Sequence, residues 1–286
     1  MITGDALAPT LDTSQRFSIL ALDHRDSLRV MFDPTDPAGV PEHELVRFKI
    51  DVVEAFGDRP SAVMLDPETS IEQILVAGRL PAGVGSLCAL EAQGYLHDGH
   101  AATNRLLDGW SPQRARSVGA SAAKLLVLYR PDGGSVTDAQ DQFIRSVVDG
   151  CRDAGLPLFV EPVPYDIKGV DDRERTIVES AARISALGPD VLKLPFPSDA
   201  HHPDRWARAC KRVHDAIDVP WAVLSWGAPI DLFVEQTRVA CANGCAGFMA
   251  GRAIWGDSIG ARDRATHLAQ VALPRFNALV AATKGE

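Results

Sequence analysis

The sequence has few cysteines, no excess of positive charge and no long apolar run, and each absence excludes a class of protein. Its five cysteines form no CxxC pair and are odd in number, which favours buried reduced thiols over a disulfide framework. The formal net charge of −9 offers no basic surface to nucleic acid or to an anionic membrane. No stretch reaches the roughly 18 apolar residues of a membrane span, and residues 1–13 do not resemble a signal peptide. We therefore expect a cytoplasmic protein with no nucleic-acid or membrane partner.

What the 286 residues do contain is a repeating pattern of short apolar runs separated by segments of helical spacing. Eight runs occur, at 17–24, 62–66, 86–92, 122–130, 158–163, 191–196, 221–227 and 246–255. Runs that are apolar on both faces, such as 125–128, are typical of parallel strands covered by helices. Eight strand–helix repeats predict a (β/α)8 barrel, the TIM-barrel fold, as a single domain over residues 1–286.

The segments between the runs carry signals for helix ends. Ser111 followed by Pro112 predicts one helix start, and Pro229 predicts another. Gly155 predicts the end of the helix that follows Ser135. The main competing fold is a doubly wound open sheet, which would carry a GxGxxG fingerprint after its first strand. Residues 21–25 read ALDHR and do not match it.

Ionisable residues interrupt or end the apolar runs, and a barrel carries its chemistry at the carboxyl ends of its strands. Burying such charges costs several kcal/mol unless they are paired, and function is one way to explain that cost. These residues are Asp23, His24 and Arg25 in the first run, Asp66 in the second, Glu91 in the third, Lys124 in the fourth, Glu161 in the fifth and Lys193 in the sixth.

Lys193 is the strongest candidate for a catalytic role. If Leu192 and Leu194 face the helices, strand alternation turns Lys193 toward the barrel axis. Apolar walls and a second cation, such as Lys124, both favour the neutral amine, which is a nucleophile. Glu161 would be placed to transfer protons beside it. The structural alternative is an internal lysine–glutamate ion pair that only fills the barrel.

The last two runs carry a different signal, at residues 224–228 and 250–253. Gly227 and Gly251 would let backbone N–H groups approach an anion, and the loops after the seventh and eighth strands commonly bind phosphate in barrels. Arg252 would add a fork of donors. Alternatively, the glycines only permit tight strand-to-helix turns. We expect a phosphate or another tetrahedral anion at this place.

Seven segments in register resemble the metal-independent class I aldolases, in particular the group that holds tagatose-1,6-bisphosphate aldolase and sulfofructose-phosphate aldolase. They are 21–25, 65–68, 123–126, 160–162, 190–193, 224–227 and 250–255, and the similarity covers about residues 16 to 280. The resemblance implies a lyase without cofactor or metal, active on a ketose phosphate of the tagatose 1,6-bisphosphate or sulfofructose 1-phosphate type. Its products would be dihydroxyacetone phosphate and an aldehyde. It also implies a homo-oligomer, since relatives form them.

The resemblance further implies a role for each matching residue. Lys193 matches the Schiff-base lysine, Glu161 the proton-transferring carboxylate, Asp23 the acid that holds substrate hydroxyls, and Lys124 the second active-site lysine. The expected substrate-binding residues are His24, Arg25, Asp66, Ser225, Trp226, Gly227, Gly251 and Arg252. Two of these depart from the relatives, because Trp226 stands where a small residue is usual and His24 where a glutamine is usual. The identity of the substrate is therefore open.

Two alternatives belong to other classes of function. A metal-dependent lyase or hydrolase would use His97 and His100, or His201 and His202, together with Asp23 or His24. A non-catalytic sensor would bind a sugar phosphate in the same barrel without turning it over.

Overall fold

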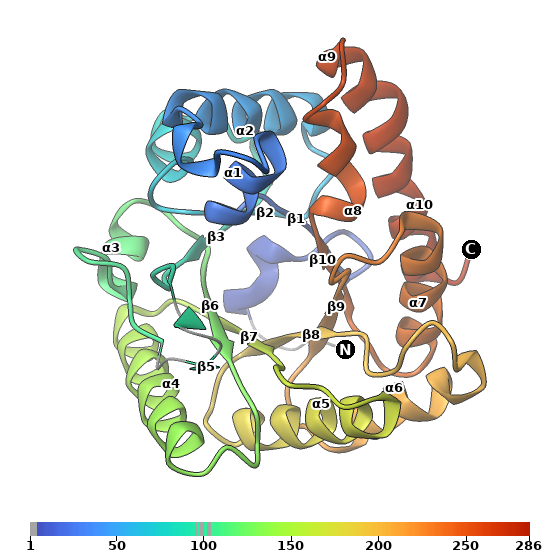
Figure 1. The fold of residues 1–286 in the computed structure, drawn as a ribbon. Coiled ribbons are helices and arrows are strands. Elements are labelled where there is room, and N and C mark those ends of the chain that lie inside the picture. The colour runs from blue at the N-terminus through green and yellow to red at the C-terminus, as the bar shows by residue number, and fades with distance from the viewer. Residues whose placement is uncertain (1–4, 95, 98–99, 102–103) are drawn as a thin grey trace.

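The computed structural model describes residues 5–286 except 95, 98–99 and 102–103. Eight parallel strands close into a barrel in the order β1-β10-β9-β8-β7-β6-β3-β2, with helices around the outside (Figure 1). The barrel strands are β1 Phe17–Ala21, β2 Ala62–Leu65, β3 Gly85–Ala89, β6 Ala122–Leu128, β7 Leu158–Val163, β8 Val191–Pro195, β9 Trp221–Leu224 and β10 Gly247–Ala250. The predicted TIM barrel is confirmed, and the open-sheet alternative is wrong.

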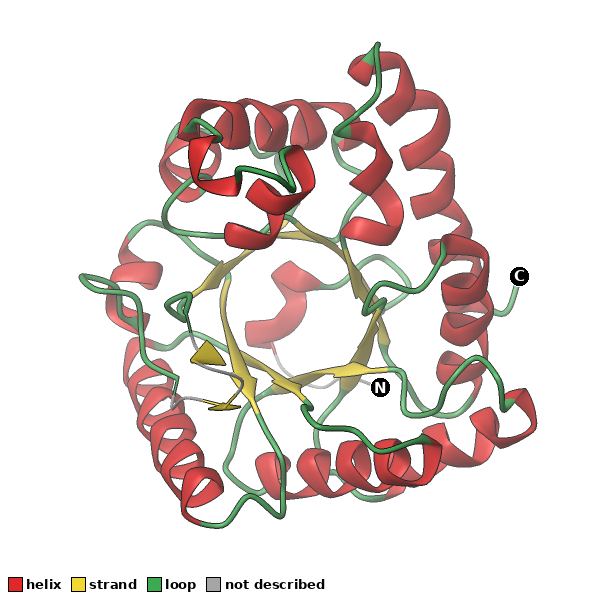
Figure 2. Ribbon diagram, in the orientation of Figure 1, coloured by secondary structure: helices red, strands yellow, loops and turns green. Residues whose placement is uncertain are grey.

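The helices form the outer ring that Figure 2 shows in red around the yellow strands. The α-helices are α1 Asp26–Phe32, α2 Glu42–Phe56, α3 Pro112–Ser117, α4 Ser135–Ala154, α5 Val170–Ser185, α6 Trp206–Asp215, α7 Ile230–Ala242, α8 Arg252–Trp255, α9 Arg264–His267 and α10 Leu273–Lys284. Shorter helical turns are η1 Asp5–Thr10, η2 Pro37–Gly39, η3 Ile71–Val76, η4 Pro203–Arg205, η5 Gly256–Ser258 and η6 Leu268–Ala272. A two-stranded pair, β4 Leu96–His97 and β5 His100–Ala101, stands outside the barrel.

Several helix ends form where the sequence predicts them. The Ser111 side chain accepts a hydrogen bond from the backbone N–H of Arg114 at the start of α3. Gly155 takes the left-handed conformation, φ +60°, that closes α4. The eighth predicted run is too long, because β10 ends at Ala250 and the rest of the run forms the short helix α8.

Alternation along the strands sorts the buried side chains into two clusters. One cluster fills the barrel interior and includes Phe17, Ala122, Phe159 and Val191. The other lies between the strands and the helices and includes Leu192 and similar residues from every strand. One face of each strand therefore packs inside the barrel and the other packs against the helices, as expected for a parallel barrel covered by helices.

The turn η1 lies at the end of the barrel where the strands begin. It is the blue-violet segment visible inside the ring of strands in Figure 1. Its Leu7 belongs to the interior cluster and is 7% exposed. The apolar interior is thus covered at the amino ends of the strands, and the carboxyl ends form the open mouth. Within the described residues, no helix is both long and apolar enough to cross a membrane.

Candidate active site

A layer of ionisable side chains lies directly above the apolar interior of the barrel. Ala21, Ala122, Phe159 and Val191 belong to the interior cluster. Because side chains alternate between the two faces of a strand, the residue two positions after each of these also points into the barrel. Those residues are Asp23, Lys124, Glu161 and Lys193, and they line a cavity of about 220 Å³ at the mouth of the barrel. The four residues predicted to be catalytic are therefore brought together.

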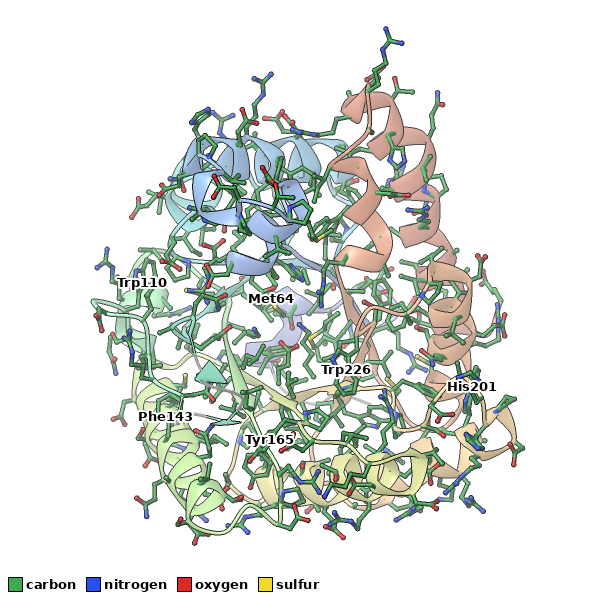
Figure 3. All side chains as sticks on the ribbon, in the orientation of Figure 1. Met64, Trp110, Phe143, Tyr165, His201 and Trp226 are labelled. Carbon is green, nitrogen blue, oxygen red and sulfur yellow. The ribbon has the colours of Figure 1, made fainter. Side chains whose placement is uncertain are left out.

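Lys193 lines this cavity and, within the described part of the chain, contacts a single carboxylate. Its Nζ is 2.9 Å from Oε2 of Glu161 and 3.7 Å from Sδ of Met64, which is labelled in Figure 3. The side chain is 6% exposed. The register explains the contact, since Val160 pairs with Leu192 and the next residues along β7 and β8 are Glu161 and Lys193.

Lys124 has a different environment, because three carboxylates surround its ammonium group. Nζ is 2.7 Å from Oε1 of Glu91, 2.8 Å from Oδ2 of Asp23 and 3.1 Å from Oε2 of Glu161. Burial opposes the charge, but the three carboxylates outweigh burial and raise the pKa of Lys124 well above its usual value. Lys124 is therefore held as a permanent cation.

The same contacts keep the carboxylates of the site ionised. Burial alone would raise the pKa of Asp23 and Glu161, but Lys124 and Lys193 offset it and lower both pKa values below their usual range. In this buried group Asp23, Glu91 and Glu161 lie against Lys124, Lys193 and Arg25. Glu68 is a further partner of Arg25.

His24 lines the cavity as a neutral imidazole. Burial, followed by the charge of Arg252, outweighs the attraction of Asp23 and lowers the pKa of His24 to about 3. Its ring packs edge to face with Trp255, with centroids 5.2 Å apart. Its buried Nδ1 has no hydrogen-bond partner among the described residues. His24 is thus placed to donate or accept a hydrogen bond without carrying charge.

Arg25, a predicted substrate-binding residue, does not line the cavity. The side chain is 4% exposed and lies behind the site. Its Nη1 donates to Oε2 of Glu68 at 2.7 Å, and its Nη2 donates to the carbonyl oxygen of Glu91 at 2.8 Å. These acceptors engage the guanidinium behind the site, and substrate contact by Arg25 stays a prediction.

Asp66 is also placed outside the cavity. Alternation from the inward Met64 would turn Asp66 inward, but β2 ends at Leu65 and the chain turns. The Asp66 carboxylate forms a fully buried ion pair with Lys49 of α2 and accepts a hydrogen bond from the backbone N–H of Thr69 at 2.8 Å. Substrate contact by Asp66 stays a prediction, since Lys49 neutralises this carboxylate outside the lining of the cavity.

The predicted anion-binding residues divide between two cavities. Arg252 lines the central cavity, and Ser225 and Gly227 line a neighbouring cavity of about 350 Å³. Trp226 lines both. Gly251 borders neither, but a Cβ at this position would lie 2.3 Å from the carbonyl oxygen of Ala21, so only glycine fits between β10 and β1.

Two buried residues were not among the predicted site residues, although the sequence carries a signal for each. Glu91 follows β3 as the one charge of its apolar run, and it is the partner that lies closest to the Lys124 ammonium. Lys49 interrupts the apolar face of α2, where Phe48 and Val52 are also fully buried. A single charged residue on an otherwise apolar, buried face requires a partner of opposite charge. Such a residue in the sequence therefore indicates a buried ion pair.

The histidines of the metal hypothesis are only partly described. The side chains of His97 and His100 lie outside the described residues. His202 is occupied by Asp199, with 2.6 Å between Nδ1 and Oδ1. No group of three or more histidine, cysteine, aspartate or glutamate side chains in the described part of the chain is arranged to hold a metal.

Two larger cavities lie away from these charges. One, of about 690 Å³, lies between α2 and residues 261–269, and the other, of about 640 Å³, lies near the amino ends of the strands. Among the described residues, neither is lined by a lysine. The small central cavity, by contrast, joins lysines to carboxylates at the expected end of the barrel.

A family model described as DeoC/LacD family aldolase matches residues 17–257 of the chain. The chain belongs to the DeoC/LacD family of aldolases. The tagatose 1,6-diphosphate aldolase 1 of Streptococcus pyogenes is 28% identical to it over 271 residues, covering 85% of this chain and 81% of the relative. This DeoC/LacD protein is a class I aldolase, a lyase that works through a Schiff base. The predicted class of enzyme is confirmed.

Solved structures agree with the fold of this family member. An archaeal fructose 1,6-bisphosphate aldolase superposes with a TM-score of 0.68 at 20% identity and covers 99% of each chain. An archaeal aldolase structure with the catalytic lysine covalently bound to the carbinolamine intermediate has a TM-score of 0.65 at 20% identity, over 98% of this chain and 99% of that one. These similarities show the barrel architecture.

Proposed function

We propose that Lys193 is the Schiff-base lysine of this aldolase and that Glu161 transfers its protons. The observation that carries the proposal is the 2.9 Å contact between Lys193 Nζ and Glu161 Oε2 at the floor of the cavity. Lys124 also lines the cavity, but three carboxylates hold it as a cation. Lys193 has one carboxylate contact, so a single proton transfer to Glu161 frees its amine for attack.

The first half of the proposed reaction forms the iminium. The amine of Lys193 adds to the C2 carbonyl of a ketose phosphate and gives a carbinolamine. Glu161 returns its proton to the C2 hydroxyl, which leaves as water. The resulting iminium is a cation beside the carboxylate of Glu161, whose Oε2 lies 2.9 Å from Lys193 Nζ. This buried pairing of opposite charges stabilises the intermediate.

The second half breaks the carbon–carbon bond. Glu161 accepts the proton of the C4 hydroxyl, the electrons of the C3–C4 bond move toward the iminium nitrogen, and the aldehyde leaves. The enamine that remains is protonated at C3. Water then hydrolyses the iminium and releases dihydroxyacetone phosphate and the free amine of Lys193. Asp23, fixed by its 2.8 Å contact with Lys124, is proposed to accept hydrogen bonds from substrate hydroxyls.

The phosphate on the dihydroxyacetone half is proposed to bind at the end of β10. Arg252 lines the cavity there, and Gly251 leaves the backbone without a side chain. A guanidinium pairs well with phosphate oxygens, and an anchored phosphate would orient C2 toward Lys193. Ser225 and Gly227 border the neighbouring cavity instead. Their contact with the same phosphate stays a prediction.

The substrate is proposed to be a ketose phosphate of the tagatose 1,6-bisphosphate or sulfofructose 1-phosphate type. The family supports a sugar phosphate as substrate, and the relative named above is a tagatose 1,6-diphosphate aldolase. The departures at His24 and Trp226, which both line the central cavity, fall where the bound sugar would be contacted. A homo-oligomer in the cytoplasm stays a prediction.

The test is a panel of ketose phosphates that includes tagatose and fructose bisphosphates and sulfofructose phosphate. Formation of dihydroxyacetone phosphate is measured with the purified protein and with Lys193→Met. We expect one or more members to be cleaved by the natural protein and none by the variant, with the circular dichroism of the two proteins unchanged. Lys211→Met, at an exposed lysine paired with Asp215, is the matched control and should keep full activity. Turnover that survives in Lys193→Met would overturn the assignment.

A further inference from the structure

The side chain that borders both cavities at the end of β9 is Trp226. On one side lies the active-site cavity of about 220 Å³, with Lys193 and Arg252 in its lining. On the other side lies the cavity of about 350 Å³ whose lining includes Ser225 and Arg173. Trp226 is labelled in Figure 3 near the ends of β8 and β9. The tryptophan therefore forms a partition between the proposed Schiff-base lysine and a second cavity.

The backbone holds this partition in an unusual conformation. Trp226 has φ +43°, a region that bulky residues rarely occupy, and the next residue, Gly227, has φ +80°. Such a conformation costs on the order of 1–3 kcal/mol in a residue other than glycine. The indole is also 36% exposed, so burial does not repay that cost in full. A tryptophan kept here at such a cost is better explained by shaping the cavity than by stabilising the fold.

Arg173, at the start of α5, stacks on the far face of this indole. Its guanidinium carbon lies 4.5 Å from the ring centroid. Nε and Nη2 donate to the carbonyl oxygen of Phe196 at 3.2 and 2.9 Å. None of the carboxylates in the described part of the chain lies within 4.0 Å of this guanidinium. Asp199 lines the same cavity, but its carboxylate is engaged by His202.

Arg173 is consequently a cation with donor capacity to spare. Burial lowers its pKa to about 10, with Asp199 opposing, so the guanidinium still carries its charge at neutral pH. Two of its N–H groups contact one neutral carbonyl oxygen, and a guanidinium has five N–H donors. An anion entering this cavity would find a fork of donors without having to displace a carboxylate.

Resting on the proposed function, we propose that Trp226 is a specificity-determining residue that limits the length of the ketose, and that Arg173 behind it is a latent subsite for a second anionic group. With the indole present, the substrate has to fit the central cavity. With the indole removed, the two cavities join, and a phosphate or sulfonate at the far end of a longer substrate reaches Arg173.

The experiment replaces the partition and measures substrate preference. Trp226→Gly suits the positive φ at this position, and Trp226→Asn is the second variant in case glycine weakens the fold, since asparagine also tolerates this conformation. For each protein, kcat and KM are measured for a ketose 1-phosphate and for the corresponding 1,6-bisphosphate. We expect the ratio of kcat/KM, bisphosphate over monophosphate, to rise roughly tenfold, mainly through KM, because a new charge-assisted hydrogen bond is gained.

A pair of double variants assigns the gain to Arg173. Trp226→Gly combined with Arg173→Gln should return the ratio to the natural value. Trp226→Gly combined with Arg175→Gln is the matched control, because Arg175 lies on the same helix, is half exposed and is already paired with Asp172 and Glu179. That control should keep the gain. A ratio that does not change in Trp226→Gly or Trp226→Asn, or a gain that persists without Arg173, would overturn the proposal.

Two readouts separate this proposal from the proposed function. Borohydride trapping reports whether Lys193 still forms a Schiff base in every variant. If no variant is trapped and none turns over, the proposed function has failed. Binding of inorganic phosphate, measured by calorimetry, then tests the subsite without catalysis. It should be stronger in Trp226→Gly than in Trp226→Gly with Arg173→Gln, and equal binding in the two would contradict the subsite.

Discussion

Lys193 and Lys124 share one carboxylate oxygen, Oε2 of Glu161, at 2.9 Å and 3.1 Å respectively. The two lysines differ in what else they touch. Lys124 also contacts Asp23 and Glu91, whereas no second carboxylate lies within 4.0 Å of Lys193 in the described part of the chain. In the proposed mechanism the two lysines have separate roles, because three carboxylates raise the pKa of Lys124 whereas Lys193 has one carboxylate partner. Glu161 is the group that links them.

Replacing Glu161 with glutamine tests its role as the proton carrier. Glutamine keeps the size of the side chain but cannot accept a proton, so we expect kcat to fall by roughly 10²–10⁴-fold. The adduct at Lys193 should still form on long incubation with substrate and borohydride. Steady-state kinetics and trapping measure the two effects. Glu179→Gln, at an exposed glutamate of α5, is the control and should be active. A kcat for Glu161→Gln within about threefold of the natural value would exclude general acid–base catalysis by Glu161.

His24 predicts how stability depends on pH. Burial lowers the pKa of His24 from its ordinary value of 6.5 to about 3 in the folded protein, so between these pH values the unfolded chain binds a proton that the folded chain does not. The stability that neutral His24 contributes is fully present above pH 6.5. It is lost progressively as the pH falls from 6.5 toward 3. In His24→Gln, the decrease in unfolding free energy between pH 7 and pH 4.5 should be smaller by about 2–3 kcal/mol.

Urea unfolding at the two pH values measures this difference. The ionised carboxylates Asp23 and Glu161 also lose stability as the pH falls, but they do so in both proteins, so the comparison isolates His24. His43→Gln, at an exposed histidine of α2, serves as the control and should follow the natural protein. An identical pH dependence for His24→Gln would show that His24 is protonated normally in the fold.

Asp66 should affect stability and leave substrate binding unchanged. In Asp66→Asn, the ammonium of Lys49 stays fully buried without its carboxylate, so we expect the free energy of unfolding to fall by about 3–5 kcal/mol. KM should change by less than about twofold in the folded fraction, because Asp66 is fully buried outside the cavity lining. Asp215→Asn breaks an exposed pair with Lys211 and should cost less than about 1 kcal/mol. A large increase in KM with normal stability in Asp66→Asn would show that Asp66 contacts the substrate.

The sequence predicts the parts of the site that strand alternation controls. Glu161 and Lys193 lie inside their strands, so period-two alternation places both on the barrel axis. Lys124 follows the same rule in β6. The number of barrel strands is predicted equally directly from the eight apolar runs, because a parallel strand covered by helices has to be apolar on both faces.

The predicted site residues that the structure places outside the central cavity lie beyond the strand ends, where alternation no longer applies. Asp66 is one residue past β2, and the turn there directs it to Lys49 on a helix 17 positions earlier in the chain. Ser225 and Gly227 follow β9 and border a separate cavity, and Trp226 between them takes a positive φ. Backbone conformation in a loop is set by tertiary contacts such as the Arg173 stack, and a single sequence does not contain them.

The central claim is tested most directly by locating the Schiff base. The natural protein is incubated with a cleaved ketose phosphate, reduced with borohydride, digested and analysed by peptide mass spectrometry. We predict one modified lysine, Lys193, with Lys124 and Lys49 unmodified. An adduct on Lys124, or full turnover with no borohydride inactivation, would contradict the account.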